Sequence, residues 1–99
     1  MRPIHVGIGT DIGAGTSFSQ IASLNAAYKI AALNRAPITA FEELYLATRG
    51  GARALDLDER IGSLQPGGEA DLVVLDPTAT PLLAFRNARS RSLEETRSF

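Results

Sequence analysis

The chain has 99 residues, of which 44% are hydrophobic and 21% are charged, and its formal net charge is −1. These values are typical of a soluble globular protein and argue against a nucleic-acid partner, and no apolar run reaches the ~18 residues that cross a bilayer, so we expect no membrane partner. Cysteine is absent, which excludes disulfides and thiolate metal ligands, and the first residues lack the apolar core of a signal peptide, so we expect a cytoplasmic location.

The first predicted element is a strand over residues 4–8. Ile4, Val6 and Ile8 alternate with small or polar residues, and a period of two is typical of a strand. A glycine-rich loop follows and contains Asp11. Asp11 therefore lies where a strand ends and a loop begins, just before a helix, and α/β folds place their chemistry at this edge.

A helix is predicted over residues 17–33. Ser17 and Gln20 have the spacing of a capping box, and Pro37 lies just beyond the expected end of the helix. Apolar side chains at spacings of three and four indicate one buried stripe. The stripe consists of Phe18, Ile21, Leu24, Tyr28 and Ala31.

A second helix is predicted to begin at Thr39, which has capping-box spacing to Glu42. Gly50 and Gly51 are expected to stop this helix, and a short third helix is expected over residues 52–55. The buried face of the second helix is predicted to consist of Phe41, Leu44, Tyr45 and Thr48.

The character of the sequence changes near Arg60, where we place a boundary. Pro66 and Gly67 suit the two central positions of a type II turn over residues 65–68. The continuous apolar run LVVL in residues 72–75 predicts a strand buried on both faces. Residues 81–99 are interpreted as a mainly polar tail, whose arginines we expect to be solvated.

Two stretches resemble a known family. Residues 6–19 (VGIGTDIGAGTSFS), with Ala27, Tyr28 and Lys29 in the helix that follows, are similar to the region around barrel strand 8 of the guanine deaminases, which are metal-dependent amidohydrolases. Residues 48–76 resemble the C-terminal signature of the same superfamily. The GAGTSFS portion favours guanine deaminases over related chlorohydrolases and other deaminases.

The resemblance implies an α/β fold, as the C-terminal fragment of a (β/α)8 metal-dependent hydrolase barrel plus part of a small β-sandwich. Residues 1–60 would form the end of the barrel, with strand 8 and the following helices. Residues 61–80 would belong to the sandwich, and residues 81–99 would be a truncated tail. A complete barrel needs roughly 200 residues, so we expect a piece of a larger enzyme.

The resemblance also implies zinc-dependent hydrolysis of a purine, with guanine and water giving xanthine and ammonia, in an enzyme that we expect to be a homo-oligomer. Asp11 matches the family aspartate that is a metal ligand and that handles the proton of the attacking water, so it is both the catalytic and the metal-binding candidate. A carboxylate suits this work because it is a hard oxygen donor and a base. The plain alternative is that Asp11 caps its own loop.

His5 is the single histidine and precedes Asp11 in the same strand, so we expect it to be structural or exposed. Zinc hydrolases usually take three protein ligands, mostly histidines, and in the family these come from segments upstream. The glycine-rich loop has no lysine and does not fit a phosphate-binding motif. A nucleophilic Ser17 would need a histidine base within reach.

Three alternatives stay open at this point. The chain could belong to another amidohydrolase, such as an aminopurine deaminase or a chlorohydrolase-like enzyme. It could be a non-catalytic remnant of a split or frameshifted gene. It could also be an assembly module that pairs its exposed strand edges with another chain.

Overall fold

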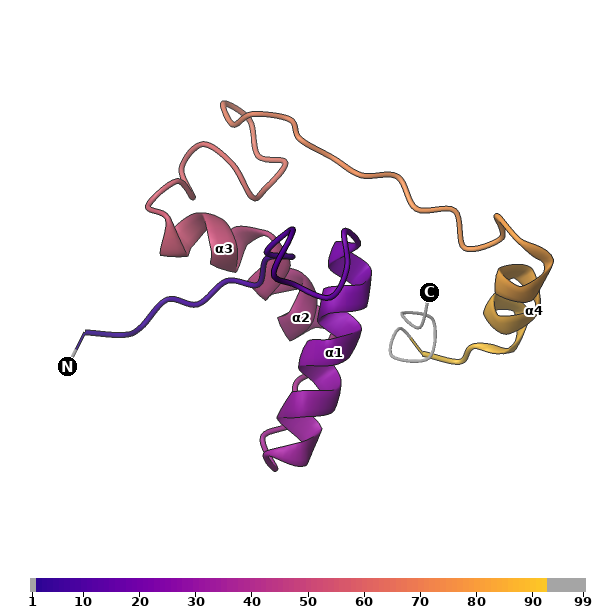
Figure 1. The fold of residues 1–99 in the computed structure, drawn as a ribbon. Helices are drawn as coiled ribbons and strands as arrows, with labels where there is room; N and C mark the ends of the chain where they lie inside the picture. The colour runs from indigo at the N-terminus through magenta and orange to yellow at the C-terminus, as the bar shows by residue number, and fades with distance from the viewer. Residues whose placement is uncertain (1, 93–99) are drawn as a thin grey trace.

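The computed structural model describes residues 2–92, which form four helices joined by turns and extended segments (Figure 1). The helices are α1 (Gln20–Leu33), α2 (Ala40–Ala47), α3 (Arg49–Ala54) and α4 (Pro81–Arg89). Helix α2 contacts both α1 and α3, and the extended N-terminal segment reaches this cluster from one side. Helix α4 lies apart from the cluster, beyond a long extended stretch. No described helix is long and apolar enough to cross a membrane.

Helix α1 begins three residues later than predicted, because Ser19 rather than Ser17 is its N-cap. The Ser19 hydroxyl accepts a hydrogen bond from the Ala22 amide at 3.3 Å. The Ser17 hydroxyl accepts instead from the Ser19 amide at 3.0 Å, a local bond that competes with helix formation. Phe18 consequently lies outside the helix with 84% of its surface exposed, so the predicted stripe buries Leu24 but not Phe18.

Helix α2 confirms the predicted capping box. The Glu42 amide donates to Thr39 Oγ1 at 3.2 Å, and the Thr39 amide donates to Glu42 Oε2 at 2.7 Å. The predicted buried face of this helix is wrong, since the buried residues are Ala40 and Glu43. The side of α2 that its neighbours cover carries Ala40 and Glu43 rather than the large apolar residues. The exposed residues of the predicted face are Phe41, Leu44, Tyr45 and Thr48.

Helix α3 includes Gly50 and Gly51, which were expected to stop α2. Helix α2 ends instead at Thr48, whose backbone angles (φ −125°, ψ −100°) leave the helical region. The glycines have a packing role, because a Cβ atom on Gly7 would lie 2.6 Å from the Gly51 Cα atom. The absence of side chains here lets the N-terminal segment cross α3 at close range.

The predicted strands are extended but unpaired. Residues 2–7 and 70–75 make no backbone hydrogen bond with other described residues. Burial of the LVVL run on both faces is also wrong for this chain, since Val73 and Val74 are 83% and 85% exposed. A strand acquires burial and ladder bonds from its neighbours, and the described residues provide none for these two segments. The small β-sandwich therefore has no counterpart in the described residues.

The turn at residues 65–68 forms as predicted. The Gly68 amide donates to the Gln65 carbonyl at 3.2 Å, and Gly67 has φ 89°, as a type II turn requires at its third position. The Arg60 guanidinium and the Glu69 carboxylate form an ion pair at 2.7 Å across the base of this loop. Turn chemistry therefore fixes the loop without help from a sheet.

Helix α4 was not predicted, because the polar residues near the end of the chain suggested a tail over residues 81–99. The signal was present: the Thr80 hydroxyl accepts from the Leu83 amide at 3.2 Å, and Pro81 occupies the first turn. The Arg89 guanidinium lies 3.6 Å from the centre of the Phe85 ring. The remainder of the predicted tail, residues 93–99, lies outside the described residues.

We predict that the isolated chain self-associates, because two extended edges and many apolar side chains are exposed. Sedimentation should show oligomers or aggregates, and hydrogen exchange should be fast in residues 4–7 and 70–75 and slowest in the helices. Val73→Asp should reduce the association more than Leu33→Asp, a matched change at the 78% exposed end of α1. A monodisperse monomer with strongly protected amides in residues 4–7 would show that the chain has a core of its own.

We also predict that α2 weakens on acidification. The hydrogen bond from the Thr39 amide, followed by the one from its side chain, holds the pKa of Glu42 below its ordinary value of 4.5. A lowered pKa stabilises the helix above the unfolded value, and this contribution disappears as pH falls through the folded pKa. Circular dichroism should show a loss of helix below pH 4.5 that is smaller in Glu42→Gln, which keeps an acceptor but does not titrate.

Candidate functional site

Asp11 lies in a tight loop between the extended N-terminal segment and α1. Its φ is 48°, and its carbonyl accepts hydrogen bonds from the amides of Ala14 at 3.1 Å and Gly15 at 2.5 Å. The backbone of Asp11, rather than its carboxylate, therefore closes the turn. The carboxylate is on an exposed residue and makes no hydrogen bond or ion pair with another described residue. The Asp11 side chain therefore does not cap its own loop, which was the alternative to its role as a metal ligand.

Gly15 allows the loop to fold back on itself. A Cβ atom at this position would lie 1.8 Å from the Thr10 carbonyl oxygen and 2.9 Å from the Asp11 carbonyl oxygen. Either distance is far below a van der Waals contact, so a larger residue would have to open the turn. Gly15 therefore provides room for the chain itself.

Both ends of the loop are attached to helices. At the first end, the Ile8 amide donates to the Leu46 carbonyl of α2 at 3.0 Å. The Ile8 carbonyl accepts from Nε2 of Gln20, the first residue of α1, at 2.6 Å. At the second end, Ser19 caps α1. These contacts fix where the strand-like segment stops and where the helix starts, and Asp11 lies between the two points.

The described residues do not complete a metal site. No group of three or more histidine, cysteine, aspartate or glutamate side chains is placed to hold a metal ion within residues 2–92. His5 is exposed, as predicted. A hydrolytic zinc site takes about three protein ligands. Asp11 therefore does not form a metal site with the other described residues alone.

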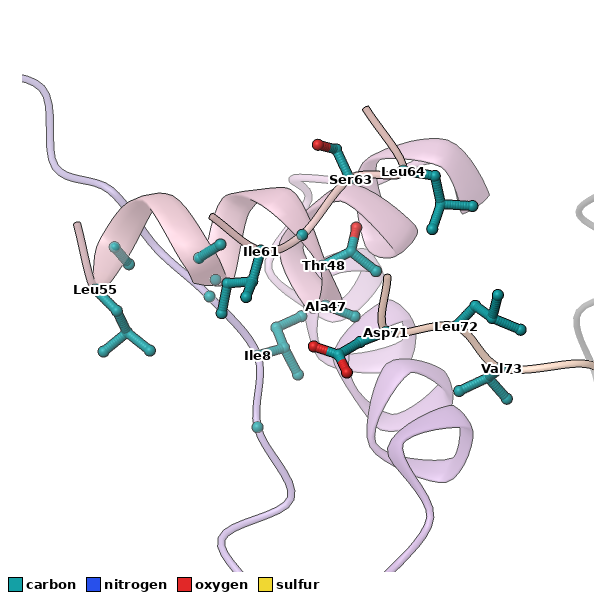
Figure 2. Close-up of a pocket in the computed structure, with 16 residues that line it drawn as sticks. Ile8, Ala47, Thr48, Leu55, Ile61, Ser63, Leu64, Asp71, Leu72 and Val73 are labelled. Atoms are coloured by element: carbon teal, nitrogen blue, oxygen red, sulfur yellow. The ribbon is translucent and has the colours of Figure 1, made fainter. Parts of the chain in front are cut away.

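A cavity of about 800 Å³ opens elsewhere on the helical cluster, between the N-terminal segment, the α2–α3 junction and residues 61–73. Figure 2 shows the side chains of Leu55 and Ile61 on one side of this cavity and those of Leu72 and Val73 on the other. Of the described lining residues, Asp71 alone is ionisable, and Asp11 is not among them. The described lining of the cavity is mainly apolar and has no acid–base pair that could perform hydrolysis.

Comparisons with known proteins identify a family and several similar sequences. The sequence model of the Amidohydrolase family matches residues 2–96. Guanine deaminase of Escherichia coli (strain K12) is 52% identical over 92 residues, which are 93% of this chain and 21% of that protein. A probable guanine deaminase of Deinococcus radiodurans is 41% identical over 96 residues, covering 94% of this chain and 22% of that protein. A 5-methylthioadenosine/S-adenosylhomocysteine deaminase of Teredinibacter turnerae is 35% identical over 92 residues, covering 89% and 21%.

The structural comparison leads to the same relatives. The solved structure of E. coli guanine deaminase matches with a TM-score of 0.86 and covers 94% of this chain and 22% of that chain. The chain thus spans about a fifth of the length of the relatives it matches. The loop that carries Asp11 and the helices that hold it lie inside the matched residues. Because the sequence model of the family matches residues 2–96, which is nearly the whole sequence, the chain belongs to the Amidohydrolase family.

Proposed function

We propose that this chain is the C-terminal part of a guanine deaminase, which hydrolyses guanine to xanthine and ammonia. The support is the 52% identity to the E. coli enzyme over most of the chain, together with the TM-score of 0.86. The observation that carries the proposal is the Asp11 carboxylate, exposed and without a described partner in a loop whose two ends are fixed.

Asp11 is the residue of this chain that we assign to the reaction. Its carboxylate oxygen accepts the proton of the water that attacks the ring carbon bearing the amino group. Members of the family generally use a metal ion, and we propose zinc, which acidifies water when it is bound. We propose Asp11 as one zinc ligand, with the other ligands supplied by parts of the whole enzyme outside this chain.

The division of the chain follows from the same proposal. Residues 1–60 would form the end of the barrel, with residues 4–8 as its last strand. Residues 61–80 would complete a small β-sandwich, and residues 81–99, with α4, would form the tail. The exposed apolar side chains of residues 72–75 support this division, because such side chains require a partner surface. A cytoplasmic homo-oligomer remains our proposal for the whole enzyme.

A second candidate is a deaminase for another purine. The 35% identity to the T. turnerae deaminase favours it over a chlorohydrolase. Two chimaeras would discriminate, each with the matched region of one relative replaced by this chain. If this chain comes from a guanine deaminase, the chimaera with the E. coli enzyme should keep a larger fraction of its parent's kcat than the chimaera with the T. turnerae enzyme.

We predict that the 99-residue chain alone does not deaminate guanine, even with zinc present, because one histidine and one well-placed aspartate do not make a hydrolytic zinc site. The E. coli chimaera should be active. Guanine absorbance and ammonia release measure the turnover of the chain alone and of the chimaera. Turnover by the chain alone above a protein-free blank would contradict its assignment as a partial enzyme, and a folded but inactive chimaera would contradict the proposed function.

We predict that Asp11→Asn in the chimaera lowers kcat by about 10²- to 10⁴-fold, since an amide is a poor proton acceptor. Asparagine is preferred to alanine because it tolerates the positive φ of this position. Asp56→Asn is the matched control, because Asp56 is also exposed and has φ 57°. Near-normal turnover in Asp11→Asn, or an equal loss in both variants, would remove Asp11 from the mechanism.

A further inference from the structure

The side chain of Gln20 closes the base of the loop that carries Asp11. Its Nε2 atom donates a hydrogen bond of 2.6 Å to the carbonyl oxygen of Ile8, twelve residues earlier in the chain. The contact is partly buried, which limits competition from water. Gln20 is the first residue of α1, so its backbone is placed by the Ser19 cap and by the helix that follows.

The same bond completes the fixation of Ile8. The Ile8 amide is already held by the Leu46 carbonyl of α2 at 3.0 Å. Its carbonyl has Gln20 as its partner, so the two polar backbone groups of one residue are attached to two different helices. Gly7, directly before it, lies against Gly51 with no room for a Cβ atom, which opposes sliding of the segment along α3.

This arrangement determines how much freedom Asp11 has. Asp11 is three residues beyond Ile8, and the turn that follows it is closed by its own carbonyl. Without the Gln20 bond, the loop would remain attached to α1 at Ser19, but its beginning would be held by the Leu46 contact alone. The exposed carboxylate would then sample more positions, because no other described residue holds it.

We propose that Gln20 is a positioning residue for Asp11, which keeps the carboxylate in one place by tying the end of the N-terminal segment to the start of α1. The proposal rests on the function proposed above. It requires a donor at this position, since the partner is a carbonyl oxygen. A carboxylate of the same length would instead face that oxygen with a second acceptor.

The test uses Gln20→Met, which keeps the length of the side chain and removes the donor, and Gln20→Glu, which keeps its shape and polarity. Asn25→Met is the matched control, because Asn25 is exposed on the same helix and its side-chain amide makes no hydrogen bond with another described residue. All three are made in the E. coli chimaera and in the 99-residue chain. The readouts are kcat and KM, the melting temperature, and hydrogen exchange of peptides covering residues 8–19.

Both Gln20 variants should lower kcat by about 10- to 100-fold, the range expected for a small misplacement of a catalytic group. KM should stay within about twofold and the melting temperature close to that of the parent chimaera, because a positioning role acts on the reacting geometry. Exchange of residues 8–19 should be faster in both variants than in Asn25→Met.

Two results would overturn the proposal. One is exchange of residues 8–19 that is the same in the Gln20 variants as in Asn25→Met, which is informative even if the chimaera does not turn over guanine. The other is a loss of kcat that is matched by a lower melting temperature, since that pattern belongs to a general structural role. An inactive parent chimaera in which only the Gln20 variants exchange faster would contradict the proposed function and leave the loop-fixing role of Gln20 supported.

Discussion

The structured part of this chain depends on how the N-terminal segment is attached to the helices at Ile8. Both backbone polar groups of Ile8 are bonded, one to α2 and one to the side chain at the start of α1. Each such bond is worth only about 1 kcal/mol in net stability. Their effect is larger than that figure indicates, because they are the contacts that give the otherwise unpaired segment a fixed end.

The rest of the structure shows which features local interactions determine and which they do not. Caps and turns are formed by residues close together in sequence, and they produce helices and loops that match the solved relative closely over this region. Local interactions do not bury the apolar side chains. The buried residues among those described are Leu24, Ala40, Glu43, Gly50 and Ala52. Such a small core cannot offset the entropy of ordering a chain of this length.

The sequence predicted those features whose cause is local. The reciprocal bonds of Thr39 and Glu42 follow from residue types at a spacing of three, and the turn at Gly67 follows from the need for positive φ. The position of Asp11 in a loop before a helix was predicted for the same reason. Helix α4 had an equally local signal in Thr80 and Pro81, and it was missed because the polar residues after them suggested a tail.

The failures share a different cause. Periodicity assigned Phe41 and Leu44 to a buried face, yet 70% and 46% of their surfaces are exposed. Periodicity shows which side chains suit an apolar environment, but the partner surface lies elsewhere in sequence or outside this chain. The same holds for residues 72–75, whose pattern requires neighbouring strands that the described residues do not contain. The exposure of these side chains is therefore information about the partner that the sequence is adapted to meet.

The candidate site combines both kinds of information. The loop geometry around Asp11 is built locally from its positive φ, the close approach of Gly15 to Thr10 and the Ser19 cap. A metal site is a collective property, because it needs several ligands at fixed distances from one ion. A segment can thus carry a preformed carboxylate without carrying the site. The carboxylate gains a defined place in such a site only if the segment is held at a fixed register, and the bonds at Ile8 set that register before any partner surface is met.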